Sequence, residues 1–488
     1  GVNLHSIPNN PKKYRPNPNL YAFFIALGLA LLKDDGKLCY IIPQTVLTAG
    51  DLDVIRYHLA KYTTIEKIFT FSSKMFINRG VKQNKAIPTS SLIFVVNKKL
   101  PPLLHKVEII NYKNSDDNID KILENILHGK NINKKEILQN NLFKNVINWN
   151  FIKQNKKFLD FYGRYIENTD DISFYYEHAL AKLAFNSNFY FDSGYAIDEK
   201  KILTKRQDKE YYYPKLNNKF WTIKDYKGFW PNIRSGSSPN LIKLRQANQN
   251  YKLLDSKYKI IWSYINPSKF YFTDLPVIWA RNQFCAIGSN NKNELLYLFS
   301  ILNSKVVNCV LIANLKNEQE KNLLISNTSI KNFVRIPKIN DRNKSIKNEI
   351  IQRTEEMLEL EEKKLSDFID FSNIMIQKFD EIKLEKDKLI LIKDENRFSL
   401  VIKENNIQKE LIKKIINEKF INENVDNITL LDLKDLPIID YDLQKQLKDY
   451  IDDLVFALYF NVTIDKLGLD EAQNIKDKCK KNQFYDIL

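Results

Sequence analysis

The sequence contains few cysteines, and this shortage argues against two classes of protein. Its 488 residues include only four, and no two of them form a CxxC pair: Cys39, Cys285, Cys309 and Cys479. A small disulfide scaffold and a cysteine-based zinc site are therefore not expected. His58 and His105 have no Cys, Asp or Glu at ligand spacing, so we predict no metal site.

Long apolar runs are also missing. The longest, residues 21–32, is about a dozen residues and shorter than a membrane span requires. No signal peptide opens the sequence. We therefore expect a cytoplasmic protein that has no membrane partner.

Positive charge, by contrast, is in excess. Lys and Arg number 75 against 59 Asp and Glu, which gives a net charge of +16. This excess points to a polyanionic partner such as nucleic acid. The length and the hydrophobic fraction of 44% suit a globular protein of two or three domains.

The stretch 38–43, LCYIIP, organises the first part of the chain. It follows an Asp-Asp-Gly turn signal and ends in a proline. Apolar residues at helical spacing precede it over 21–33 and follow it over 51–62, where Asp51 is placed to cap the second helix. Helix, turn, buried strand and helix is the pattern of a parallel α/β sheet. Ligands of such sheets bind outside the carboxyl ends of the strands, here next to Pro43 and Gln44.

More strands are predicted at 64–71, 90–97 and 107–112, the first two as a hairpin. We therefore predict that 21–112 form part of a doubly wound, Rossmann-like sheet. It should be rich in parallel pairs, carry the helices 21–33 and 51–62 on its faces, and have an exposed edge or face. Residues 1–112 form the first predicted domain, and 113–165 are predicted as a helical connector.

Residues 166–340 are predicted as a separate α+β domain. Between Lys200 and Arg281 there are 17 Lys and Arg but only 5 Asp and Glu, a net +12, together with four of the five tryptophans. One interpretation is a β-rich domain with ordinary aromatic core residues and a solvated basic face. The other is a surface that binds double-stranded DNA through phosphate and base contacts. Candidate DNA-binding residues are Arg234, Lys243, Arg245 and Arg281, because arginine grips phosphate or guanine with two hydrogen bonds.

The last region, 341–488, is predicted to be helical. A long amphipathic helix is expected over about 345–383, with an apolar stripe that includes Ile346, Ile350 and Met357. Another helix is expected over 443–460, after the Pro-bearing run LLDLKDLPIID.

Taken together, these segments resemble the C-terminal portion of gamma-class, TaqI-like adenine-specific DNA methyltransferases of restriction–modification systems. Residues 21–43 resemble the helix and strand that follow the family's catalytic Asn-Pro-Pro-Tyr loop. Residues 69–96 resemble its later strand pair, and 260–304 its target-recognition domain. The resemblance implies methyl transfer from S-adenosylmethionine to the exocyclic amine of an adenine that has been flipped out of the duplex.

The sequence departs from this family in two segments. It has 12 Gly and no Gly-x-Gly pair, so the loop that binds S-adenosylmethionine is not found. The Asn-Pro-Pro-Tyr loop is also missing, although Asn9 and Asn17 each precede a proline by one or two positions. We therefore assign no cofactor-binding residue. We expect a fragment or a split-enzyme subunit, inactive by itself, that requires a missing N-terminal half or a separate catalytic subunit.

Phe76 is the one catalytic candidate that the resemblance provides. It follows the strand 64–71 in the motif SKMFINRG, where the family carries an aromatic that stacks on the flipped base. The alternative is that Phe76 caps the core of the sheet. Two other functions stay open: a non-enzymatic DNA-binding specificity subunit, and an interaction protein whose helical tail, 345–488, binds a partner.

Overall fold

The computed structural model describes residues 19–71, 91–112, 119–172, 256–265, 269–274, 284–316, 323–403, 406–421 and 428–488, with a few isolated positions and short strand pieces between them. The chain divides into two compact units. Unit 1 comprises Gly1–Ile172, Val307–Pro337 and Gln483–Leu488, and unit 2 comprises Ser173–Val306 and Lys338–Asn482. Both units are therefore assembled from separate stretches of sequence.

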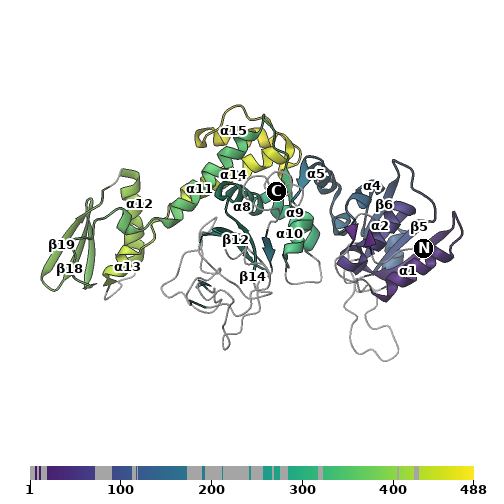
Figure 1. The fold of residues 1–488 in the computed structure, drawn as a ribbon, viewed down its shortest axis with the longest axis horizontal. Helices are drawn as coiled ribbons and strands as arrows, with labels where there is room; N and C mark the ends of the chain where they lie inside the picture. Colours follow the sequence, from purple (N-terminus) through teal and green to yellow (C-terminus); the bar gives the residue numbers. More distant parts are fainter. Residues whose placement is uncertain are drawn as a thin grey trace, which may run out of the picture. The chain divides into compact units, whose positions relative to one another are not determined.

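Unit 1 is built on a five-stranded sheet whose spatial order is β3-β5-β4-β6-β7 (Figure 1). The strands are β3 (Lys37–Pro43), β4 (Thr64–Phe71), β5 (Ser91–Asn97), β6 (Lys106–Tyr112) and β7 (Ile132–Leu138). β5 is antiparallel to both β3 and β4, β6 is parallel to β4, and β7 is antiparallel to β6. The α/β character and the antiparallel pairing of 64–71 with 90–97 are confirmed. The expected richness in parallel pairs is wrong, because β5 lies between β3 and β4 and separates these two parallel strands.

Two helices cover one face of this sheet. α1 (Leu20–Leu31) packs on β3 at Gly28, where an added Cβ would lie 3.0 Å from the Tyr40 hydroxyl. α2 (Asp53–Tyr62) packs on β4 and contacts α1. No side chain caps α2, and Asp51 lies in the short 3-10 turn Gly50–Leu52 instead, so the predicted Asp51 cap is wrong. Both predicted helices are present, and they share one face.

The other face of the sheet is covered near the ends of β4 and β6. There α3 (Ile119–Leu127) contributes Ile122 to a cluster with Phe71 and Tyr112. The segment 113–165 is not only a helical connector, because β7 within it completes the sheet. It also holds α4 (Gln139–Lys144) and most of α5 (Lys156–Glu167).

The remaining described parts of unit 1 are short. α9 (Lys305–Leu315), most of which belongs to this unit, is followed by α10 (Asn327–Phe333) and β15 (Arg335–Pro337). β15 pairs antiparallel with β8 (Thr169–Asp171), and β1 (Ser6–Ile7) pairs with β2 (Asn10–Pro11).

Unit 2 contains a four-stranded sheet of order β13-β12-β14-β9. Its strands are β12 (Tyr258–Ser263), β13 (Tyr271–Thr273), β14 (Phe284–Ser289) and β9 (Tyr190–Asp192), all antiparallel. A separate pair joins β10 (Tyr211–Tyr212) and β11 (Leu241–Ile242). α8 (Lys292–Asn303) packs against β12 and contributes a run of buried residues. Among the described residues, this sheet and α8 agree with the α+β character predicted for 166–340.

Three further helices pack with α8 in unit 2. α11 (Lys344–Glu362) contacts α8 and α14 (Tyr441–Phe460), and α15 (Ala472–Lys480) packs on α14. Thr354 of α11 and Ser300 of α8 share a buried hydrogen bond of 2.6 Å. The helix predicted at 443–460 is confirmed. The one predicted over 345–383 is wrong beyond Glu362, where α11 ends.

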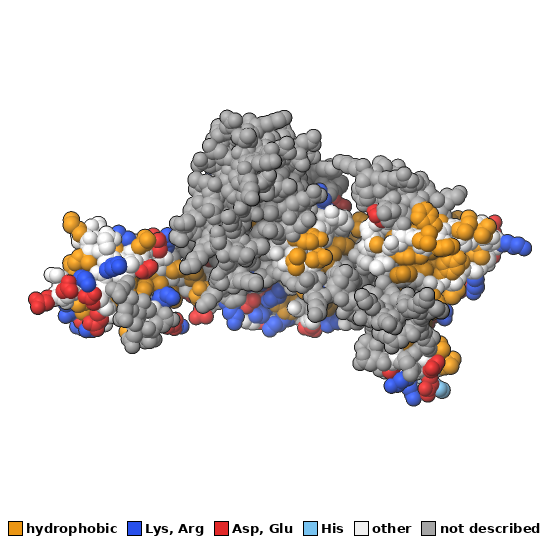
Figure 2. Space-filling view, turned by 90° about the horizontal axis from the view of Figure 1, so that it is seen from below, with side chains coloured by type: hydrophobic (Ala, Val, Ile, Leu, Met, Phe, Trp, Pro, Cys, Tyr) orange, Lys and Arg blue, Asp and Glu red, His pale blue; other side chains and the backbone are white. Residues whose placement is uncertain are grey.

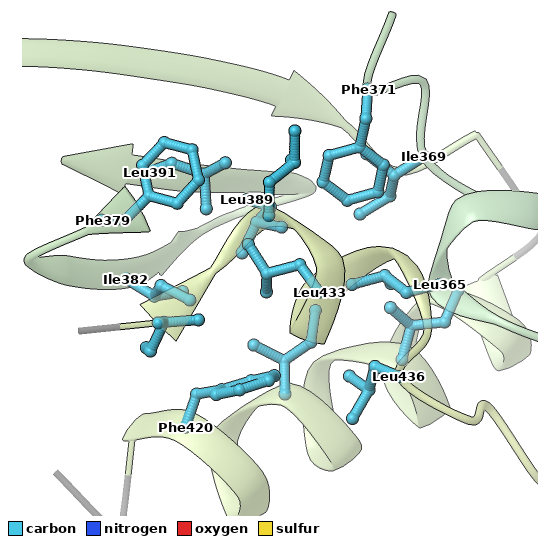
Figure 3. Packing of buried hydrophobic residues seen from close by; sticks show 14 of the residues in the cluster. Leu365, Ile369, Phe371, Phe379, Ile382, Leu389, Leu391, Phe420, Leu433 and Leu436 are labelled. Atoms are coloured by element: carbon cyan, nitrogen blue, oxygen red, sulfur yellow. The ribbon is translucent and has the colours of Figure 1, made fainter. Parts of the chain in front are cut away.

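The chain between α11 and α14 forms a module with its own core. It contains β16 (Lys378–Phe379), β17 (Glu381–Glu385), β18 (Lys388–Lys393), β19 (Asn396–Val401), α12 (Asn406–Ile416), β20 (Ile428–Thr429) and α13 (Leu430–Lys434). Leu389 and Leu391 of the sheet belong to this core together with Phe420 and Leu433 (Figure 3). The expectation of a wholly helical C-terminal region is therefore wrong for this module, which begins and ends side by side: Leu365 N donates to Leu436 O at 2.9 Å.

Among the described residues, no single helix is both long and apolar enough to cross a membrane. α8 and α9 reach that length and composition only together, and they are bent by 57° with respect to each other.

Candidate functional site

The carboxyl ends of β3, β4 and β6 lie at the same edge of the sheet of unit 1. This follows from the pairing, since β3 and β4 are both antiparallel to β5 and β6 is parallel to β4. These strands end at Pro43, Phe71 and Tyr112. Ligands of open α/β sheets bind at such an edge, and we therefore treat it as the candidate site.

Gln44 follows β3 directly and joins the other two strands beside it. Its Nε2 donates to the carbonyl oxygen of Phe71 at 2.5 Å and to that of Ser91 at 2.9 Å. Phe71 is the last residue of β4 and Ser91 is the first of β5. One half-buried amide thus ties together the two strand ends from which residues 72–90 extend.

The segment after β3 is held by two more contacts. The hydroxyls of Thr45 and Tyr21 are 2.8 Å apart, which joins this segment to the first turn of α1. On the other side, the backbone N–H of Trp149 donates to Leu47 O at 2.7 Å. The carboxyl end of β3 is thus joined to α1, β4, β5 and the 149 region.

Arg56 of α2 binds backbone carbonyl groups of the same segment. Its guanidinium is fully buried and donates to Val46 O at 2.7 Å, to Ala49 O at 3.0 Å and to Ile147 O at 2.6 Å; Nε donates to Val146 O. Burial lowers the pKa of Arg56 to about 10, with the Asp53 carboxylate acting in the opposite direction. Arg56 is therefore still charged at neutral pH, and backbone carbonyls satisfy it.

At the end of β6, a polar cluster lies on the opposite face of the sheet. The Tyr112 hydroxyl donates to Asp117 and accepts from Asn125 Nδ2 at 2.7 Å. Lys121 pairs with Asp117 at 3.1 Å. Burial, together with the hydrogen bond to Asp117, raises the pKa of Tyr112. This phenol is therefore neutral near pH 7 and is a hydrogen-bond partner rather than a base.

α1 carries a second apolar face, which is exposed. Its buried residues are Ala22, Ile25 and Leu29, whereas the outer stripe is between 50% and 76% exposed: Leu20, Phe23, Phe24, Leu27 and Leu31. Ile41 of β3 is also 56% exposed. Figure 2 shows hydrophobic side chains gathered at the end of the molecule where α1 lies in Figure 1. Patches of this kind on a soluble domain usually mark an interaction site.

The predicted site residues lie outside the described part of the chain. Phe76 belongs to 72–90, and the DNA-binding candidates belong to the unplaced portions of 173–283: Arg234, Lys243, Arg245 and Arg281. Their roles stay predictions.

Among the described residues of the basic window, Trp262 and Lys259 belong to a core. Trp262 of β12 is fully buried, with its ring centroid 5.2 Å from that of Phe270. Lys259 is 1% exposed and donates to Ser256 O at 2.6 Å. For Trp262 the interpretation as an aromatic core residue is confirmed, whereas Lys259 is buried and does not belong to a solvated basic face. Not every aromatic and cation in the window is therefore available to DNA.

Sequence reasoning pointed to the end of β3 but missed the residues that build it. Gln44 was named only as part of the neighbourhood, and its bridge to β4 and β5 depends on pairing that the sequence does not show. Arg56 had a usable signal. It lies between Ile55 and Tyr57 on an otherwise apolar stretch of helix, where a lone cation is either exposed or fully satisfied.

The described residues do not make a metal site or a cofactor cradle. No group of three or more metal-ligating side chains occurs among them, and the four cysteines are free. Of the described glycines near the sheet, Gly36 precedes β3 and Gly50 lies in the turn before α2; neither directly follows a strand. The donors at the candidate site are amide and hydroxyl groups that already bond to the protein. They do not fit the Gly-containing loop that S-adenosylmethionine requires in the family resembled.

Part of the chain matches a known protein family. Residues 5–76 match the family described as Eco57I restriction-modification methylase. This segment includes α1, β3, α2 and β4 and therefore most of the candidate site. The N-terminal part of the chain is thus similar to restriction–modification methylases. No curated protein matches the chain significantly.

Several solved structures share a distant likeness. The type IIG restriction endonuclease BpuSI is 14% identical, with 71% of this chain and 45% of that chain covered and a TM-score of 0.28. The type IIL restriction-modification enzyme MmeI in complex with DNA is 9% identical, with 95% and 52% covered and a TM-score of 0.40. A type I restriction-modification S subunit from M. genitalium is 14% identical, with 62% and 94% covered and a TM-score of 0.21. The chain thus spans about half the length of the first two, and likenesses this weak carry no argument.

Proposed function

We propose that the chain is the DNA-recognition and partial catalytic region of a site-specific adenine DNA methyltransferase of a restriction–modification system. The complete enzyme transfers a methyl group from S-adenosylmethionine to the exocyclic amine of adenine. The observation that carries the proposal is the methylase family match over 5–76, the segment that builds the carboxyl edge of β3 and β4.

In this proposal the two units have different tasks. The edge at Gln44 and Phe71 belongs to the half of the catalytic domain that faces the flipped adenine, and Phe76 stacks on that base. The basic window Lys200–Arg281, net +12, belongs to the region that reads the DNA. S-adenosylmethionine supplies the methyl group, and the segment that binds it is separate from the residues described.

The free side of β3 and the exposed apolar face of α1 define where a partner binds in this proposal. In the described sheet, β3 has β5 on one side and no strand on the other. α1 precedes β3. A strand before α1 that runs parallel to β3 would complete a βαβ unit beside β3, on the side away from β5. The outer stripe of α1 offers a further apolar surface to the same partner. We propose that the cofactor-binding half, covalently joined or as a separate subunit, lies beside β3 on the side away from β5.

Calorimetry and a methyl-transfer assay test the proposal together. The chain alone should bind no S-adenosylmethionine, whereas the chain with its cofactor-binding half should bind it and label plasmid DNA from a methyl-tritiated cofactor. Chromatography of the digested DNA should place the label in N6-methyladenine. Micromolar binding by the chain alone, or label in a methylated cytosine, would overturn the proposal.

A further inference from the structure

We infer that Gln44 is a positioning residue, which sets the points where the segment 72–90 leaves β4 and rejoins β5. The inference rests on the proposed function, because its consequence for catalysis requires that Phe76, within that segment, stacks on the target base. Gln44 itself is not assigned a contact with substrate.

The geometry singles out one side chain. Gln44 Nε2 lies within 2.9 Å of two carbonyl oxygens, those of Phe71 and Ser91, and these residues are the last of β4 and the first of β5. A primary amide nitrogen has two protons, so it can donate to both oxygens at once. Gln44 therefore fixes the separation of the two strand ends, next to the place where β3 itself ends.

The surroundings make this bridge rigid. Phe71 is 2% exposed, and its ring is stacked on Phe69 at 4.7 Å between centroids. Arg56 and Tyr21 fix the residues that immediately follow Gln44, through Val46 O and the Thr45 hydroxyl. Buried Phe71 thus supports the acceptor side of the amide, and contacts of Thr45 and Val46 support the backbone that follows Gln44. Functional groups require such support from neighbouring residues in order to stay within about 0.5 Å of a productive geometry.

Substitution distinguishes donation from mere space filling. Gln44→Ala removes both hydrogen bonds, and Gln44→Glu keeps the size of the side chain but replaces the donor with a carboxylate that repels both carbonyls. Gln473→Ala is the matched control, because it removes an exposed glutamine amide that donates to Asp477 within α15, outside the candidate site. The full chain is the sample, and hydrogen exchange by mass spectrometry is the measurement.

In Gln44→Ala and Gln44→Glu, peptides that span the end of β4 and the start of β5 should exchange about tenfold faster. Peptides from β6 and β7 should be unchanged, and Gln473→Ala should exchange like the parent at both strand ends. In the complete enzyme, Gln44→Ala should lower the single-turnover methylation rate about tenfold while its affinity for duplex DNA stays within about twofold.

Two results would overturn the inference. One is unchanged exchange at both strand ends in Gln44→Ala. The other is Gln44→Glu indistinguishable from the parent, which would mean that the side chain only fills space. Phe76→Ala separates this inference from the proposed function: if that variant methylates normally, the base-stacking role fails, while the exchange data still decide what Gln44 holds.

Discussion

The Nη1 of Arg56 donates to the carbonyl oxygen of Val46 at 2.7 Å, so a fully buried charge on α2 holds the segment that follows β3. Charged side chains are seldom buried without an acidic partner in hydrogen-bond contact. Here backbone carbonyls from two separate loops take that place. The position of the segment after β3 therefore depends on Arg56, to which we assign a structural and not a catalytic role.

We predict that Arg56→Ala lowers the free energy of unfolding by roughly 3 kcal/mol or more, because several buried carbonyls lose their donor. The free energy of unfolding of Arg56→Lys should lie between those of the parent and of Arg56→Ala, because an ammonium lacks the planar guanidinium that reaches two loops. Arg164→Ala is the control: its side chain is 62% exposed and paired with an exposed Glu167, so its effect should stay within about 0.5 kcal/mol. Urea denaturation measures all three. An Arg56→Ala protein as stable as Arg164→Ala would contradict the account.

The cysteines should differ in reactivity by burial. Burial raises the pKa of Cys309 to about 11 and that of Cys479 to about 12, whereas Cys39 is exposed. Because the thiolate is the reactive form, a disulfide reagent at pH 8 should modify one thiol per chain rapidly, and Cys39→Ser should remove that phase.

The same shifts fix the sign of a pH dependence. Both thiols ionise near pH 9 when unfolded but only at about 11 and 12 when folded. Their contribution to stability is therefore complete below pH 9 and is lost as the pH rises toward those values. In the modification experiment above, rapid reaction of Cys479 at pH 8 would mean that α15 opens easily, and it would contradict the low reactivity expected for a buried thiol.

The exposed stripe of α1 should contribute to binding of the cofactor-binding half and little to the stability of the folded chain. Phe24 and Leu27 are each 52% exposed, so Phe24→Asp and Leu27→Asp should leave the unfolding of the chain within about 1 kcal/mol of the parent. Both should abolish binding of the cofactor-binding half. Ile25→Asp, on the buried face of the same helix, should instead unfold the chain. Mixing followed by size-exclusion chromatography gives the readout, and undiminished complex formation by both surface variants would rule out this face.

DNA binding should be sensitive to salt and concentrated in the basic window. Changing Arg234, Lys243, Arg245 and Arg281 singly to Ala should weaken binding, and each lost phosphate contact should reduce the slope of log K against log [salt] by about 0.9. Fluorescence anisotropy on short duplexes at several salt concentrations measures both quantities. Lys480→Ala is the control, since residues 345–488 carry 23 Lys and Arg against 31 Asp and Glu. Four variants that bind like the parent would reject this surface.

Local patterns predicted most elements of unit 1. The alternation of a strand such as TIEKIFTF (64–71) and the apolar spacing of a helix are both encoded within a few consecutive residues. The strand predicted at 64–71 is β4, and the one at 38–43 is β3 with one more residue. Strand order was not predictable. Residues 72–90 are long enough to return on either side of β4, and nothing local requires β5 to lie between β3 and β4.

The inserted module shows a second limit. Ile346, Ile350, Leu365 and Ile369 continue one helical stripe in sequence, yet the first two are buried in α11 and the last two in the module core. Lys363 and Lys364 carry no glycine or proline signal for the break. The helix ends because the chain there pairs with the distant segment at Pro437, which is information that no local pattern contains.

The most direct test of the central claim is a map of methylated bases in living cells. The chain should be expressed together with its cofactor-binding half in a bacterial host that has no adenine methylation of its own, and the host DNA read by single-molecule sequencing. The account predicts N6-methyladenine at a single sequence motif, its loss when either component is omitted, and a reduced modified fraction with Phe76→Ala. Unmodified adenine throughout, with the complex intact and bound to DNA, would contradict it and favour a specificity subunit without catalytic chemistry.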